Sequence, residues 1–303
     1  MSIGITVQKL KIRSLDVDFH EVSWEIESVS AQTDIFDYTF AVLRSGGAEG
    51  PYEVITAEME DQYLFIDNNL KAADIYRQYH YKIRVTRKSD GATEEFGPAS
   101  PDPEPDLIAL ELRKHMNLLF REFIGRRCWV FPARTFGQRC GCFNPTLQKR
   151  TKSGCRTCYD TGYVRGYFTP IEAWISFDPS PKANQQTNMG EMQQTNTTAR
   201  VGYFPPLKPR DLIIEPENIR WRVVSVSTTQ QLRAPVHQEV QLHRIPKTDI
   251  EYALNFDIGG ALKDLFLSPA RNFTNPHNLE NFMDEEIPDI LNLYPGTYPP
   301  VNT

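Results

Sequence analysis

Residues 140–163 read CGCFNPTLQKRTKSGCRTCYDTGY and hold four of the chain's five cysteines. Cys140 and Cys142 form a Cys-x-Cys pair. Cys155 and Cys158 form a Cys-x-x-Cys pair, and twelve residues separate the two pairs. Two short thiolate pairs joined by a loop of hairpin length suit tetrahedral zinc. The sequence therefore predicts that these four cysteines hold one metal ion.

Other uses of the cysteines fit the sequence to different degrees. An iron–sulfur cluster takes the same four thiolates, so it stays open beside zinc. A redox Cys-x-x-Cys fits less well, because no thioredoxin-like βαβ pattern surrounds this pair. The N-terminus lacks a signal-peptide pattern, so we expect a chain kept in a reducing cytosol, where disulfides are unusual. Cys128 stands apart, and we expect a buried thiol beside Trp129.

The residues around the four cysteines agree with a metal site. Three glycines permit the tight turns that wrap a backbone around bound sulfur: Gly141, Gly154 and Gly162. Five basic residues would offset part of the negative charge of four thiolates on one divalent ion: Arg139, Lys149, Arg150, Lys152 and Arg156.

The first hundred residues read as short alternating strands separated by turns. Val22, Trp24 and Ile26 fall on one face of VSWEI, and YTFAVLRS at 38–45 repeats the pattern. Glycine-rich stretches such as SGGAEGPY at 45–52 mark the turns. About seven strands in about 95 residues are typical of a β-sandwich.

Residues 1–100 also resemble a fibronectin type III domain. Trp24 stands where the core tryptophan of the family's second strand belongs, YKIRV at 81–85 is similar to the sixth strand, and FGPAS at 96–100 to the last. The resemblance implies a binding or spacer module without chemistry of its own.

Residues 101–105 form a proline-rich linker. Four prolines between Pro98 and Pro105 disfavour both helix and sheet pairing. We expect this linker to be semi-rigid and to be crossed by few contacts, so that residues 1–100 are dispensable for assembly. The rest of the folded chain, residues 106–253, is predicted to be a second domain.

That second domain is predicted to begin with a helix over residues 106–124. Asp106 can cap the helix, and Gly125 stops it. Apolar residues recur there at helical spacing, and we expect this stripe to dock on the body of the protein: Ile108, Leu112, Met116, Leu119 and Phe123. We expect basic residues on or near the other face to be solvated: Arg113, Lys114 and Arg121.

Residues 163–250, which follow the metal-binding knuckle at 140–158, are predicted to form a small β-barrel. Asp211 begins a strand, EPEN at 215–218 makes a turn, and VHQEVQLHRI at 236–245 forms the last strand. Any small barrel fits this pattern, including an oligonucleotide-binding one. Residues 184–198 are nearly free of charged and apolar side chains, which predicts a long loop or a hairpin tip.

Residues 254–303 contain many apolar groups but show no sustained period and carry six prolines. We expect an extended arm that orders against a neighbouring subunit, with five anchoring side chains: Leu262, Leu265, Phe266, Phe273 and Phe282.

Charge is divided unevenly along the chain. Residues 1–106 have 20 acidic and 10 basic groups, residues 107–249 have 11 and 21, and residues 250–303 have 8 and 2, which gives −10, +10 and −6. Opposite potentials of this kind steer association.

The stretch from Leu112 to Ile175 combines the helix, the two cysteine pairs and TGYVRGY at 161–167 leading into strands. This order resembles the neck, or head-to-tail connector, proteins of tailed bacteriophages, and the strands after Asp211 are similar to the barrels of phage head-completion proteins. CRTCYDTGYV also resembles one zinc knuckle of the J-domain co-chaperones. However, only one such unit is present, no J domain precedes it, and Asp160 replaces the first glycine of that repeat.

The phage resemblance implies a structural virion protein that is assembled in the host cytoplasm and located in the neck. It implies a homo-oligomeric ring between a portal or adaptor protein and a tail terminator or tail tube protein, with DNA passing through the lumen.

The sequence has no phosphate loop, His-Glu-x-x-His or Gly-x-Ser-x-Gly motif, and its six histidines are scattered, so we expect no enzyme. No apolar run approaches about 18 residues, so we expect no membrane partner. The alternative is a zinc-containing module that binds nucleic acid through its basic middle.

Overall fold

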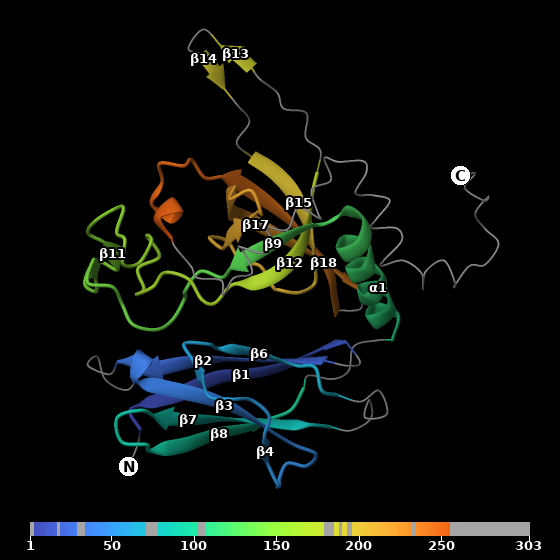
Figure 1. Ribbon diagram of the computed structural model, residues 1–303, viewed down its shortest axis with the longest axis vertical. Helices are drawn as coiled ribbons and strands as arrows, with labels where there is room; N and C mark the ends of the chain where they lie inside the picture. Colours follow the sequence, from blue (N-terminus) through green and yellow to red (C-terminus); the bar gives the residue numbers. More distant parts are fainter. Residues whose placement is uncertain are drawn as a thin grey trace, which may run out of the picture. The chain divides into compact units, whose positions relative to one another are not determined.

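The computed structural model describes residues 3–16, 19–28, 34–70, 78–101, 107–178, 185–187, 190–192, 196–231 and 234–254 (Figure 1). These residues belong to one compact unit, Met1–Phe256. Residues 102–105 of the expected linker and residues 255–303 of the expected arm lie outside the described residues. The described chain is mainly β, as predicted.

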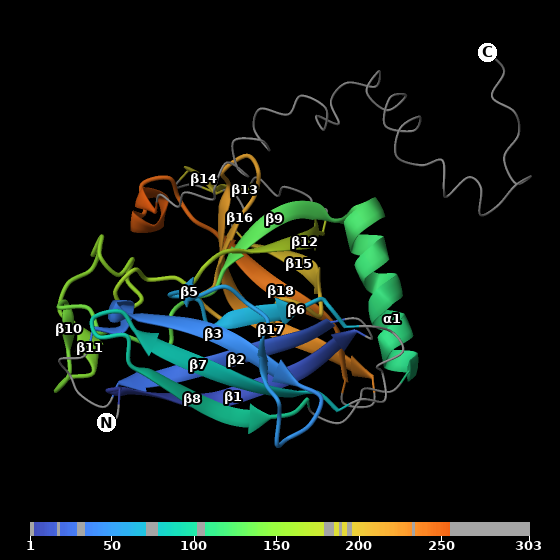
Figure 2. The same ribbon diagram turned by 60° about the horizontal axis from the view of Figure 1, so that its bottom comes forward.

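The N-terminal part is a sandwich of two antiparallel sheets (Figure 2). One sheet has the order β1-β2-β6, with the bounds Ile5–Asp16, Phe19–Ser28 and Leu64–Asp67. The other has the order β4-β3-β7-β8, and β5 also pairs with β3. Its strands are β3 Tyr38–Ser45, β4 Glu53–Val54, β5 Met59–Glu60, β7 His80–Arg87 and β8 Thr93–Ala99. The short helix η1, Ile35–Asp37, precedes β3.

One apolar core lies between the two sheets, and it uses the predicted alternation. Val22, Trp24 and Ile26 are buried on β2, as expected for one face of a strand. The ring of Trp24 lies 6.0 Å from that of Phe40 on the opposite sheet, and the ring of Phe40 lies 5.3 Å from that of Tyr63. Burial of such large rings removes much apolar surface from water, which stabilises the sandwich.

The second part is a closed barrel with the strand order β12-β15-β18-β17-β16-β9, which confirms that a barrel forms, although β9 lies before the predicted range of 163–250. The barrel strands are β9 Arg126–Phe131, β12 Ile171–Phe177, β15 Asn196–Gly202, β16 Leu212–Ile214, β17 Arg220–Gln231 and β18 Ala234–Arg244. Every second residue of β18 from Ala234 to Leu242 is buried, because strand side chains point alternately inward and outward. The short helix η4, Ile250–Ala253, follows β18.

A β-bulge adjusts the pattern of β17. Val223 pairs with Leu242 and Ser225 pairs with Gln241, so Val224 is an extra residue without a partner in the ladder. Val224 is 54% exposed, whereas Val223 is buried. The bulge lets both Val223 and Val226 contact the barrel core, although residues three positions apart would point to opposite faces of an unbroken strand.

Asp211 precedes β16, close to its predicted place at a strand start. Its buried carboxylate accepts the amide N–H of Ala133 at 2.8 Å and that of Lys208 at 2.7 Å. Burial nevertheless raises the pKa of Asp211 to about 6. The carboxylate ties the chain that leaves β9 to the strand beside it.

The predicted helix is present as α1, Leu107–Leu118, followed by the π-helical turn η3, Leu119–Ile124. Gly125 ends it, as predicted, and donates its amide to the carbonyl oxygen of Phe120 at 2.9 Å. A Cβ at position 125 would lie 2.2 Å from that oxygen, so only glycine fits this close approach.

The predicted docking face of this helix is wrong. Ile108 is 58% exposed and Phe123 is 73% exposed, whereas Ala109, Arg113 and Phe120 are buried. The barrel strand that packs on the helix, β18, presents the carbonyl group of Pro235 to it, which favours a donor at that point over an apolar side chain. The other two basic residues of the helix, Lys114 and Arg121, are exposed as expected.

Arg113 supplies that donor. Its Nε donates to the carbonyl oxygen of Pro235 at 2.7 Å, and its Nη1 donates to that of Ser14 at 3.3 Å. The guanidinium group also lies 4.7 Å from the ring centre of Tyr203. The expectation of a solvated Arg113 is therefore wrong, because its planar guanidinium group donates to two backbone carbonyl groups and packs on an aromatic ring.

The segment at 184–198 contains a short hairpin where the structure describes it. Strand β13, Gln185–Thr187, pairs antiparallel with β14, Gly190–Met192. Strand β15 begins at Asn196 and returns to the barrel. The expectation of a hairpin tip is thus met for these residues.

Candidate metal centre

The two cysteine pairs are brought together by a hairpin between paired barrel strands. One pair precedes β10, Phe143–Asn144, and the other follows β11, Lys149–Arg150. The amide of Thr151 donates to the carbonyl oxygen of Cys142 at 2.8 Å, which closes the open end of the hairpin. The predicted ligands meet at this end because an antiparallel hairpin returns the chain to its starting point.

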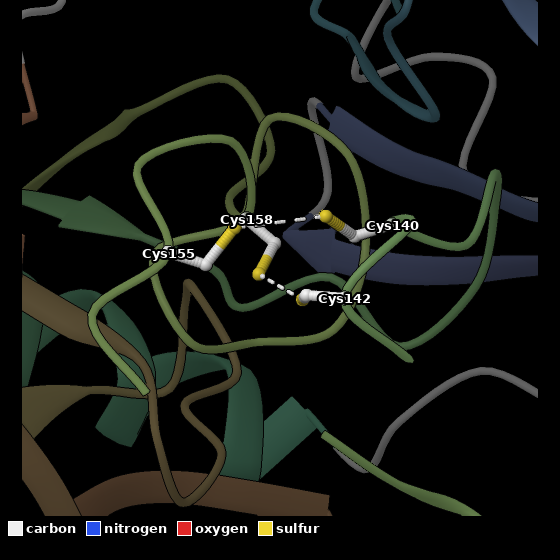
Figure 3. Close-up of side chains that lie close together, drawn as sticks. All are labelled: Cys140, Cys142, Cys155 and Cys158. Carbon is white, nitrogen blue, oxygen red and sulfur yellow. Dashed lines mark hydrogen bonds between the residues drawn. The ribbon is translucent and has the colours of Figure 1, made fainter. Parts of the chain in front are cut away.

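The four cysteine sulfur atoms converge (Figure 3). All of them lie within 4.8 Å of one another. The Sγ atoms of Cys140 and Cys155 are 3.8 Å apart, and those of Cys142 and Cys158 are 3.4 Å apart. A disulfide needs about 2.05 Å, so these are free thiols.

The size of the cluster matches a metal site. A tetrahedral ion with metal–sulfur bonds of about 2.3 Å needs sulfur–sulfur separations of about 3.8 Å. Of the two sulfur–sulfur distances given above, 3.8 Å equals that value and 3.4 Å is slightly shorter. The four cysteines named from the sequence can therefore bind a metal ion together.

The composition of the cluster is that of a structural site. Within the part of the chain that the structure describes, it is the one convergent group of three or more His, Cys, Asp or Glu ligands, and all four are cysteines. Catalytic zinc sites keep a position for water or substrate, whereas four thiolates fill the coordination sphere. A metal held in this way joins backbone segments.

Backbone amides favour the thiolate form of Cys155. The N–H groups of Thr157 and Cys158 donate to its sulfur, with the Thr157 amide contributing most, and they lower the pKa of the Cys155 thiol to about 6. Burial instead raises the pKa of the Cys158 thiol. A bound cation would offset this effect, because it stabilises the ionised sulfur.

Asp160 supports the second cysteine pair, a role that the sequence motif did not predict. Its carboxylate accepts the amide N–H of Gly154 at 3.2 Å and that of Cys155 at 3.3 Å. Burial opposes ionisation, but these two hydrogen bonds lower the pKa of Asp160 below its usual value. One feature of the sequence could have indicated this role: Asp160 stands where the related repeat has glycine. In the structure it adopts a φ of 62°, in the left-handed region that glycine tolerates best.

The turns around the cysteines use two of the three predicted glycines. Gly154 has a φ of 69° and Gly162 has a φ of 88°, both in the left-handed region that side chains disfavour. Gly141 does not share this conformation.

The five basic residues predicted to offset the thiolate charge do not act alike. Arg150 pairs with Asp160 at 2.8 Å, so its charge is already balanced. Arg139 lies between two aromatic rings, 4.2 Å from the centre of Phe143 and 4.1 Å from that of Tyr163. The remaining three are exposed: Lys149, Lys152 and Arg156. Exposed charges are screened by water, so their effect on the thiolates is small.

The metal loop, which we define as residues 132–168, contacts the sandwich as well as the barrel. Its two ends pair with each other, because the amide of Arg134 donates to the carbonyl oxygen of Gly166 at 3.0 Å. The rings of Phe136 and Phe168 lie 4.9 Å apart, and that of Tyr63 from the sandwich lies 5.0 and 5.6 Å from them. The expectation that few contacts cross the linker is wrong, since these rings extend the core of the sandwich.

Cys128 is separate from the cluster, as predicted. It is fully buried in β9 next to Trp129, within the core of the barrel. Burial raises the pKa of its thiol far above the usual value, so the thiolate that would act as a nucleophile or ligand is suppressed.

Fold and site together define a two-part β protein with a four-cysteine centre in the loop between two barrel strands. No protein-family model and no curated protein sequence matches this chain. Among the described residues, no helix has the length and apolar character needed to cross a bilayer.

Proposed function

We propose that this chain is a structural virion protein of a tailed-phage neck, which forms a homo-oligomeric ring that joins the portal or adaptor protein to the tail terminator or tail tube protein. The observation that carries the proposal is the position of the four-cysteine cluster. It lies in the loop between β9 and β12, two strands of the closed barrel, and the α1 helix precedes β9 in the chain. This is the order of elements on which the resemblance to phage connectors rests.

The metal of this centre is zinc. Zinc takes four thiolates in a tetrahedron without redox chemistry and stabilises small loops that lack a core of their own. The metal loop needs such support, because its strands β10 and β11 are two residues long each. The metal serves assembly by keeping the loop folded between barrel and sandwich.

The sandwich in this proposal is an accessory domain, and the barrel is the part that contacts ring neighbours. DNA passes through the lumen of the ring without sequence-specific contacts. The net charge of +10 in residues 107–249 supports passage of a polyanion near this part of the chain.

A zinc-containing nucleic-acid-binding module is the second candidate. The observation that favours it is the exposure of Lys149, Lys152 and Arg156 on the metal loop, where they could contact phosphate groups.

Two experiments test these functions. Mass spectrometry of purified phage particles from a culture that encodes the chain should detect it as a component present in several copies per particle. Its absence from particles would reject the neck assignment. In a DNA-binding titration, a nucleic-acid module that contacts six or more phosphates would lose about 10³-fold or more in affinity between 50 and 200 mM salt. A neck protein would bind DNA weakly at both concentrations.

A further inference from the structure

The α1–η3 helix carries a concentrated apolar surface. Nine large apolar side chains are exposed among the described residues, and six of them lie between residues 108 and 124. The six are Ile108, Leu112, Leu118, Leu119, Phe123 and Ile124. Soluble monomers rarely gather exposed apolar groups in this way, so the surface indicates a binding site.

Four of these side chains form a single stripe. Ile108 and Leu112 are one turn apart, Leu119 follows two turns after Leu112, and Phe123 follows one turn later, so they share one side of the helix. The side that packs on the barrel is a different one, because it uses Ala109, Arg113 and Phe120. The stripe is therefore free of the intramolecular packing that holds the helix in place.

We propose that this stripe, the α1 stripe, is the docking site for residues 255–303 of a neighbouring copy of the chain. The choice of a neighbouring copy rests on the proposed ring. The segment has the composition that the stripe needs, with Leu262, Leu265 and Phe266 at i, i+3 and i+4 spacing. Such spacing places apolar side chains on one side of a helical turn that can lie along another helix.

Charge also matches between the two. Residues 255–303 contain seven acidic and two basic residues, a net charge of 2 − 7 = −5. Residues 107–131, which hold the stripe, contain two acidic and five basic residues, a net charge of 5 − 2 = +3. Lys114 and Arg121 are exposed on the same helix but on the side away from the stripe, so the match lies in the net charge of this region and not in contacts at the stripe itself.

The point where the segment leaves the barrel suits a contact with another copy. Arg220 holds η4 to the barrel, with a guanidinium nitrogen 3.3 Å from the carbonyl oxygen of Leu254. Figures 1 and 2 show η4 and α1 on opposite sides of the barrel. The stripe is about 22 Å long, and 49 residues can extend up to about 160 Å, so the segment can reach a neighbour.

Hydrogen exchange on the full-length protein over a range of protein concentrations tests the proposal. We expect the backbone amides near residues 262–266 and those of the helix at 108–124 to gain protection as the protein concentration rises. This gain should follow the increase in mass measured by light scattering. Ile108→Glu and Phe123→Glu should each abolish this gain. Leu147→Glu is the matched control, because Leu147 is 65% exposed outside the stripe, and it should keep the gain.

Three results would overturn the proposal. Residues 255–303 could stay unprotected up to the solubility limit. Their protection could persist in both stripe variants, or it could be independent of concentration, which would mean docking within one chain. A stripe that becomes protected while residues 255–303 do not would instead indicate helix-to-helix pairing of two copies. Melting curves of the variants should match that of the wild type, and Phe123→Ala provides a second, milder variant if Phe123→Glu does not fold.

The outcome is separable from that of the neck assignment. Concentration-dependent docking in a protein that is absent from phage particles would reject the neck alone. A particle component whose stripe variants assemble normally would reject the docking site alone.

Discussion

Arg134 of the metal loop and Asp61 of the sandwich form an ion pair at the junction of the two parts. The Arg134 side chain is 2% exposed and that of Asp61 is 11% exposed. Arg134 also donates its Nε to the carbonyl oxygen of Tyr167 at 3.0 Å and lies 4.7 Å from the ring centre of Phe168. Arg165 pairs with the same carboxylate at 2.9 Å, but its side chain is 57% exposed. One carboxylate thus receives both ends of the metal loop.

Replacing Arg134 is expected to destabilise the protein strongly. Arg134→Ala leaves Asp61 buried beside a single, exposed partner, and breaking a buried ion pair costs about 3–5 kcal/mol. Arg165→Ala is the matched control, since exposed ion pairs contribute about 0–1 kcal/mol. Urea unfolding of the two variants measures the difference. Equal losses in the free energy of unfolding would show that the buried ion pair of Arg134 stabilises the protein no more than the exposed one of Arg165.

Deleting residues 1–100 is expected to destabilise the remaining chain, contrary to what the proline-rich linker suggests. The deletion exposes Phe136 and Phe168 and leaves Arg134 without its carboxylate. The melting temperature of residues 101–303 should fall below that of the full chain. As a control, a protease site placed in residues 101–105 should allow cleavage while the two parts still co-elute. Fragments that separate on cleavage would contradict the junction.

The metal is expected to contribute to folding. The protein should contain about one zinc ion per chain, and Cys158→Ser should lower both its zinc content and its melting temperature, because ligand binding is coupled to loop folding. Cys128→Ala is the matched control: it removes a buried thiol but should keep the zinc. Elemental analysis and calorimetry measure both effects. A metal-free protein with unchanged stability would reject the site.

Acidification is expected to weaken the sandwich through His20. Burial lowers the pKa of His20 below 6.5, so the folded state favours the neutral ring. Because the pKa of His20 is lower in the folded state than in the unfolded state, the neutral ring stabilises the fold above the pKa of the unfolded state. This stabilisation is lost as the pH falls through the pKa of the folded state. The melting temperature should therefore fall below about pH 6.5, and it should fall less in His20→Gln. A parallel decline in both proteins would assign the effect to other groups.

Removing the C-terminal segment is expected to weaken assembly without affecting the monomer. The cut belongs after Leu254, because Leu254 is buried and its carbonyl oxygen accepts from Arg220. Size-exclusion chromatography should show a smaller oligomer for residues 1–254 than for the full chain, with an unchanged melting curve. An earlier melting transition would mean that the segment folds back on its own chain.

Local patterns in the sequence were sufficient to predict several features. The alternation of Val22, Trp24 and Ile26 predicts a half-buried strand because successive side chains of a strand point to opposite faces. The spacing of the four cysteines predicts one cluster because a hairpin of that length returns the chain on itself. These features depend on residues close in sequence, so they can be read without the rest of the fold.

The side of α1 that packs and the junction between the two parts depend on residues far apart in the chain. The sequence alone determined that a helix with an apolar stripe would form, but the tertiary structure decided that Arg113 faces the barrel, because the fold brings the carbonyl groups of Pro235 and Ser14 within reach of its guanidinium group there. Likewise, the linker prolines describe only the connection between the sandwich and the second part. The contact itself arises because Tyr63 and Phe168, 105 positions apart, lie 5.6 Å from each other in the folded chain.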